Sequence, residues 1–132
     1  MKIHISPELL ADTKLTALMK EGLEAFVRAT QGTPTGEIAT LELSVQSLVP
    51  LPGSTRFLVV KTSIPEPELS LTKSFEVSRF DIPIVFGNDL FHLWNQFLTQ
   101  RGDYHSQRIK VLLKKLEEEE QQEAEGVYAL QN

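Results

Sequence analysis

Three histidines are the residues best suited to metal binding or acid–base chemistry in this sequence: His4, His92 and His105. Asp89 precedes His92 by three residues, which places both on one helical face, and Asp103 precedes His105 by two. Two histidines and a carboxylate are an established zinc ligand set. The HExxH spacing of zinc proteases is absent, however. We therefore expect ordinary surface histidines and no metal site.

The motifs of nucleophilic and nucleotide chemistry are also missing from the sequence. There is no GxSxG elbow, no P-loop and no dinucleotide-binding fingerprint. The carboxylates that could act as acid and base, Glu42, Glu76 and Asp81, fall on separate predicted strands. We expect no catalytic residue and no cofactor, and an enzyme would require a deep polar pocket that the sequence does not reveal.

A basic stripe is formed by Arg101, Arg108 and Lys115, each seven residues apart. On one continuous helix these charges would lie about 10 Å apart on the same side, where they could meet phosphates or an acidic partner. The simpler interpretation is a solvated face that balances the neighbouring glutamates, and we favour it.

An apolar stripe runs through the same segment, formed by Ile109, Leu112, Leu113 and Leu116. Its spacing of three and four residues is typical of one helical face. The segment around them is otherwise charged, and if the rest of the domain does not cover these four side chains, we expect another subunit or a protein partner to cover them.

The elements that position both stripes lie in residues 88–125. Asn88 and Asp89 predict a helix start, and an apolar face follows it in the sequence. Gly102 lies next to Asp103, a good N-cap residue, so a helix broken there is the favoured expectation. A single long helix is the alternative. The apolar face comprises Leu90, Phe91, Trp94, Phe97 and Leu98.

The preceding residues alternate between helix and strand patterns. Residues 1–5 predict a short edge strand, and Ser6-Pro7-Glu8 predicts a helix start whose apolar face continues to Val27. Gly22 lies in that face, either as a tolerated imperfection or where another backbone approaches closely. A loop at residues 31–36 and three strands follow, with an extended segment around Pro83. The expected strands are 39–46, 56–64 and 69–78, the second of them buried on both faces.

These patterns predict an α+β fold: an N-terminal helix, an antiparallel meander of three or four strands, and one long or broken C-terminal helix, in the order α-β-β-β-α. We expect one domain over residues 1–125 and an acidic, fraying tail over 117–132. Six of the 18 acidic residues lie in 117–125, and the remaining 12 nearly balance the 13 basic ones. The chain has no cysteine, no signal segment and no apolar run of membrane-spanning length, which favours a cytoplasmic protein.

The α-β-β-β-α order resembles that of double-stranded RNA-binding domains and of small dimeric nucleoid-associated proteins. Size, acidity and lack of cysteine are similar to type III secretion chaperones. The first resemblance would imply a lysine cluster where this sequence has Asp89-Leu90-Phe91-His92-Leu93. We assign no family. The expectation is a non-enzymatic interaction module (adaptor, small chaperone or assembly factor) that forms a homodimer through the C-terminal helix, with nucleic acid as a less favoured partner and no membrane association.

Overall fold

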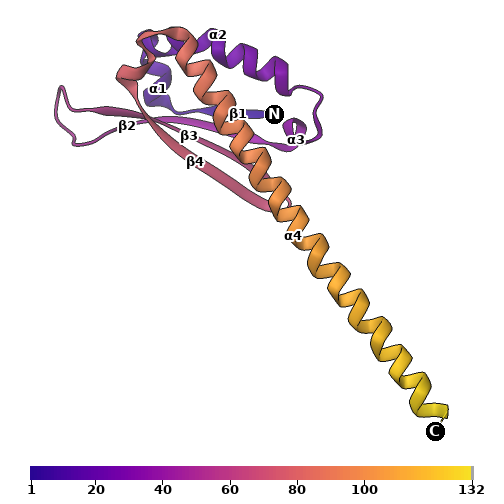
Figure 1. Cartoon of the computed structure of the whole chain (residues 1–132). Helices are drawn as coiled ribbons and strands as arrows, with labels where there is room; N and C mark the ends of the chain where they lie inside the picture. Colours follow the sequence, from indigo (N-terminus) through magenta and orange to yellow (C-terminus); the bar gives the residue numbers. More distant parts are fainter. Residues whose placement is uncertain (132) are drawn as a thin grey trace. The chain divides into compact units, whose positions relative to one another are not determined.

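The computed structural model describes the backbone of residues 1–131, and side chains up to Gln121 apart from that of Tyr104. The backbone divides into two compact units, residues 1–97 and 98–132, which we describe separately. The strands are β1 (Lys2–Ile5), β2 (Thr40–Ser47), β3 (Arg56–Pro65) and β4 (Glu68–Glu76). The helices are α1 (Pro7–Ala11), α2 (Thr13–Thr30), α3 (Pro34–Ile38), the 3₁₀ helix η1 (Val77–Asp81) and α4 (Pro83–Gln131) (Figure 1).

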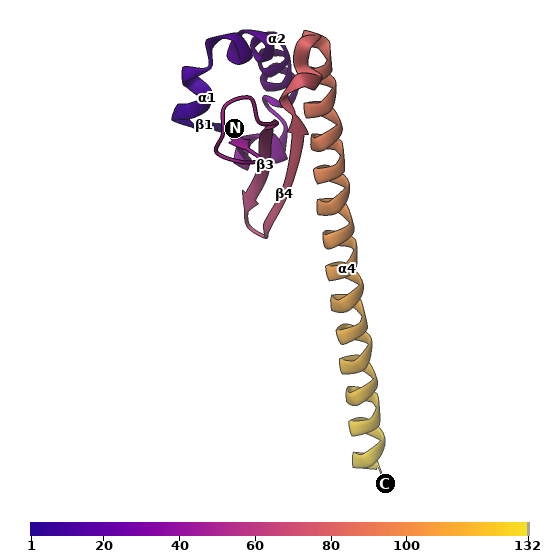
Figure 2. The same cartoon turned by 90° about the vertical axis from the view of Figure 1, so that its left-hand side faces the viewer.

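The first unit is an α+β layer structure with one four-stranded sheet, in the order β1-β2-β3-β4, so the predicted fold class is confirmed. Strands β2, β3 and β4 form the expected antiparallel meander. The sheet is mixed, since β1 pairs parallel with β2, with Lys2 opposite Thr40. Parallel pairing requires a crossover, which α1, α2 and α3 provide. Figures 1 and 2 show α1 and α2 on one side of the sheet.

The hydrophobic core lies between that side of the sheet and the helices. Phe26 of α2 is its aromatic centre: its ring meets those of Trp94 and Phe91 edge-to-face, at centroid distances of 5.5 and 5.6 Å. A second chain of rings joins Phe75, Phe80 and Phe86 (centroids 6.0 and 5.6 Å). Edge-to-face pairs of this kind contribute beyond the area that they bury.

The outer side of the sheet is not covered by the helices of this unit. Along β3, Leu58, Val60 and Ile64 are buried, whereas Phe57 and Val59, which point to the other side, are only half-buried. The prediction that β3 is buried on both faces is therefore wrong. Although four consecutive residues of β3 are apolar, only one face of the strand packs against the core.

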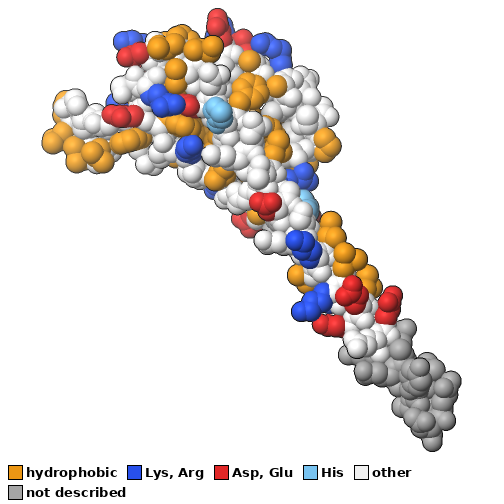
Figure 3. All heavy atoms as spheres, viewed as in Figure 1, with side chains coloured by type: hydrophobic (Ala, Val, Ile, Leu, Met, Phe, Trp, Pro, Cys, Tyr) orange, Lys and Arg blue, Asp and Glu red, His pale blue; other side chains and the backbone are white. Residues whose placement is uncertain are grey.

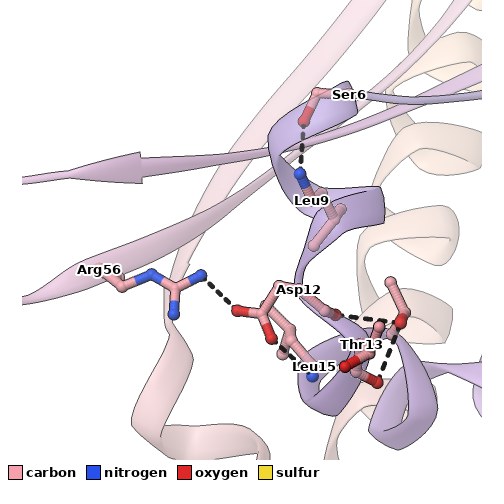
Figure 4. A network of polar contacts seen from close by, with 7 residues as sticks. Ser6, Leu9, Asp12, Thr13, Leu15 and Arg56 are labelled. Carbon is pink, nitrogen blue, oxygen red and sulfur yellow. Dashed lines mark hydrogen bonds and ion pairs between the residues drawn. The ribbon is translucent and has the colours of Figure 1, made fainter.

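Asp12 joins two helices and a strand through its backbone N–H and its carboxylate (Figure 4). Its backbone N–H donates to the Leu9 carbonyl and ends α1, while its carboxylate accepts the Leu15 N–H (3.0 Å) and so caps α2. The second carboxylate oxygen accepts a hydrogen bond of 2.6 Å from Arg56 of β3. The predicted start of α1 is confirmed, since the Ser6 hydroxyl accepts from the Leu9 N–H. Asp12, however, divides what the sequence indicated as one helix.

Replacing Asp12 tests both of its roles. The Arg56 guanidinium, and after it the Leu15 N–H, hold the pKa of Asp12 below its ordinary 3.8. Since the pKa is lower in the folded state, this stabilisation is present above pH 3.8 and is lost as the pH falls through the folded-state pKa. We expect Asp12→Ala to cost about 1 kcal/mol through the lost cap, and Asp12→Asn to cost less because asparagine also caps. Urea unfolding at pH 7 measures both changes.

The control for the ion pair is Arg56→Met, which keeps the cap. In this variant the pKa of Asp12 should rise toward 3.8, and carbon-detected NMR titration of the carboxyl group measures it. An unchanged pKa would show that the ion pair does not exist in solution.

Gly22 lies where α2 meets the first turns of α4. A Cβ atom on Gly22 would come within 2.9 Å of a Phe86 ring carbon and 3.0 Å of the Gly87 Cα. Of the two interpretations of Gly22, the structure supports the close approach of another backbone. The missing side chain allows the two helices to pack at this point.

Two further expectations of local structure are wrong. Residues 80–86 are not extended, because η1 ends at Asp81 and α4 begins at Pro83, a favoured residue for the first helical position. The helix therefore starts before Asn88, and Asp89 is not a cap. The expected loop at residues 31–36 contains the start of α3, capped by the Thr33 hydroxyl, which accepts the Gly36 N–H at 3.1 Å.

The backbone of α4 is helical through Gly102, so of the two alternatives for residues 88–125 the structure shows one long helix. Residues 83–97 belong to the first unit and 98–131 to the second. The single domain over 1–125 and the fraying of 117–132 stay predictions, and the side chains from Gln122 onward, including the expected apolar tail at Val127, Tyr128 and Leu130, lie outside the described residues.

Candidate interaction surface on the C-terminal helix

The apolar stripe predicted from the sequence is exposed within the second unit. Ile109, Leu112, Leu113 and Leu116 leave between 51% and 57% of their surface accessible. At 100° per residue, the four fall within an arc of about 100°, so they form one face two turns long. We call these four residues the apolar patch. Val111 is equally exposed but points to the opposite side of the helix.

Charged side chains surround the apolar patch in two blocks. The residues before and within it are basic: Arg108, Lys110, Lys114 and Lys115 are all exposed. The residues directly after it are acidic and exposed, from Glu117 to Glu120. Figure 3 shows hydrophobic, basic and acidic side chains following one another along this part of the helix. A surface of this composition is suited to bind another amphipathic helix.

The basic stripe is less uniform than the sequence indicated. Arg108 and Lys115 are exposed, whereas Arg101 is half-buried. The acidic block follows Lys115 after a single leucine, so the local field alternates in sign. A phosphate backbone requires an extended positive surface, and these three residues offer it only in part.

The structure separates the residues considered for metal binding. Asp89 is buried and accepts two hydrogen bonds from Arg79, at 2.6 and 2.9 Å, while His92 points to solvent. The Asp89 carboxylate raises the pKa of Arg79 through these hydrogen bonds and its charge. Among the described residues, no group of three His, Cys, Asp or Glu side chains could hold a metal ion. Asp89 therefore fixes η1 to α4 instead of serving as a ligand.

The carboxylates considered for catalysis are also apart. Glu42 lies on the outer side of the sheet, where it meets Lys61 at 3.9 Å, and Glu76 and Asp81 are exposed on other elements. An open depression of about 620 Å³ on that side of the sheet is lined by two lysines, two glutamates, three hydroxyl side chains and four apolar residues, among them Lys2, Glu37 and Glu68. Among the described residues, the structure therefore does not bring Glu42, Glu76 and Asp81 together.

A second exposed apolar surface was missed by the sequence reasoning. The connection between β2 and β3 leaves Leu48 and Leu51 more than two-thirds exposed and Val49 nearly half. Figure 3 shows hydrophobic side chains gathered over the β2–β3 connection. The sequence signal was present, since no charged residue occurs between Ser47 and Thr55. The prolines and the glycine of this segment predict a turn, and a turn leaves the exposure of its apolar residues open.

Comparison with known proteins adds no assignment. The chain matches no protein-family model, and the searches of curated proteins and of solved structures found no similar chain. Among the described residues, no helix is both long and apolar enough to cross a membrane.

Proposed function

We propose that this protein is a non-enzymatic interaction module, such as an adaptor, small chaperone or assembly factor, which self-associates through the apolar patch. The observation that carries this proposal is the exposure of all four leucine and isoleucine side chains on one helical face. Soluble proteins rarely expose a contiguous apolar surface without a partner.

The composition of the helix supports the same proposal. Residues from 98 onward form a second unit, and among the described side chains the hydrophobic core includes none after Phe97. An isolated helix is only marginally stable in water, and most helices gain their stability by packing an amphipathic face. Pairing with another helix would provide that packing for the apolar patch.

Nucleic acid is the less favoured partner, because Arg101 is half-buried and the acidic block lies beside Lys115. If the basic stripe did bind duplex DNA, Arg108→Ala and Lys115→Ala should weaken binding at low salt. The slope of the logarithm of the binding constant against the logarithm of the salt concentration should become shallower by about one for each lost phosphate contact. An absence of binding at low salt would remove this alternative.

The experiment for self-association is light scattering coupled to gel filtration, over chain concentrations from about 1 µM to about 1 mM, because a short apolar surface gives modest affinity. We expect the wild type to reach the mass of two chains. The double variant Leu112→Asp/Leu116→Asp should stay at the mass of one, since it places charge in the contact. Val111→Asp is the control: it adds one aspartate to the opposite side of the helix and should still dimerise.

A wild type that stays monomeric over this whole range would contradict the proposal. So would a dimer whose mass does not respond to Leu112→Asp/Leu116→Asp, because its contact would then lie elsewhere.

A further inference from the structure

The charges beside the apolar patch determine how a second copy can dock. This inference rests on the proposed self-association and asks in which direction the partner helix runs. At 100° per residue, Arg108 and Glu119 lie along one side of the patch, and Lys110 and Glu117 lie along the other. All four side chains are exposed. Each side of the patch thus carries a basic residue near one end and an acidic residue near the other.

We propose that two copies of this helix pair antiparallel across the apolar patch. In an antiparallel pair, the side of one helix that carries Arg108 and Glu119 lies against the same side of the other helix. A pairing centred between Leu113 and Lys114 overlaps the two patches over residues 111–116 and puts Arg108 level with the second copy's Glu119. It also puts Lys110 level with the second copy's Glu117. Two-fold symmetry repeats both contacts, so every one of these charges meets an opposite charge.

The parallel arrangement is disfavoured by the same charges. An in-register parallel pair retains one favourable contact, between Lys115 and the second copy's Glu120, at the spacing typical of parallel coiled coils. The parallel pair also places the acidic block of one chain, Glu117 to Glu120, beside the acidic block of the other. Juxtaposed like charges oppose association, and Glu119 would face its counterpart at the edge of the apolar contact.

Cysteine cross-linking tests the direction, because the natural chain has no cysteine. Ser106 and Glu120 are exposed and lie on the same side of the patch, toward its two ends. Antiparallel pairing brings Ser106 of one chain within one residue of the level of Glu120 of the other. It leaves the two copies of either residue about 20 Å apart along the axis. Mixing Ser106→Cys with Glu120→Cys under mild oxidation should therefore give a disulfide between the two variants, and neither variant alone should cross-link.

Charge exchange is the second test. Arg108→Glu/Lys110→Glu makes all four contact positions acidic, and Glu117→Lys/Glu119→Lys makes all four basic. Each should self-associate about tenfold more weakly than the wild type, because four exposed ion pairs become repulsions. A mixture of the two should regain or exceed the wild-type affinity. Circular dichroism of each variant checks that the helix is retained.

The outcomes separate this inference from the proposed function. If the wild type dimerises through the patch but Glu120→Cys cross-links by itself, the direction is wrong and the self-association stands. If the mixed charge variants bind no better than either alone, the antiparallel contacts are likewise refuted. A monomeric wild type would remove the proposed function together with this inference.

Discussion

Gly22→Leu should destabilise the protein by about 3 kcal/mol, at the upper end of the range for overpacked sites. Even a single Cβ atom would lie 3.0 Å from both the Cα and the nitrogen of Gly87. These contacts are with backbone, which cannot rotate away as a side chain can. The leucine would therefore push α2 away from the first turns of α4 and weaken the aromatic contacts between them. Urea unfolding followed by circular dichroism measures the loss.

Gly102→Leu is the matched control, because it makes the same change in an exposed turn of α4. Nothing lies within 4 Å of a Cβ atom at Gly102, and glycine is about 1 kcal/mol less favourable than alanine within a helix. This variant should keep or increase the helical signal and leave the unfolding of residues 1–97 unchanged. If Gly22→Leu were equally harmless, α2 and α4 would not pack as the structure shows.

Phe26→Ala should cost about 3–5 kcal/mol, the usual range for truncating a buried phenylalanine. Phe26 is only 1% exposed, and its ring contacts both Phe91 and Trp94. Trp94 is the only tryptophan in the chain, so its fluorescence reports on this site directly. We expect a red-shifted emission in the folded variant, because water or a cavity replaces the ring beside the indole.

The control for this prediction is Phe57→Ala, on the outer side of the sheet. Phe57 is half-buried there, and its loss should cost about 1 kcal/mol and leave the Trp94 emission unchanged. If Phe26→Ala and Phe57→Ala lowered the free energy of unfolding equally, the core would not lie on the helical side of the sheet.

The regular periods in the sequence predicted the fold class well. Alternation at Leu41 and Leu43 identified β2, and the spacing of Leu15, Met19 and Phe26 identified α2, because each pattern reflects one face turned to a shared core. Pro83 misled the prediction because proline fits both an edge strand and the first turn of a helix. Only packing decides between these, and Phe80 and Phe86 are both buried in the core beside it.

The candidate site could be predicted in part. Its residues followed from the helical spacing of Ile109, Leu112 and Leu116, but their exposure did not, since a helical apolar face predicts equally well a surface buried in the same chain. The exposure of Leu48 and Leu51 could not be predicted, because the turn residues beside them determine the backbone and not which side chains the core covers. Gly22 left two interpretations open, and only the position of Gly87 distinguishes them.

Strand β1 has a consequence for the order in which the sheet is completed. Its partner, beginning at Thr40, lies far along the chain from Lys2, whereas β2, β3 and β4 are joined by short connections. Closing a long loop costs more chain entropy than closing a hairpin. The three-stranded meander can therefore assemble first. When β1 then pairs with Thr40 to Leu43, it covers half of the β2 edge, which could otherwise pair with strands of other molecules. By this argument, the four residues of β1 pair last and protect part of the β2 edge from intermolecular strand pairing.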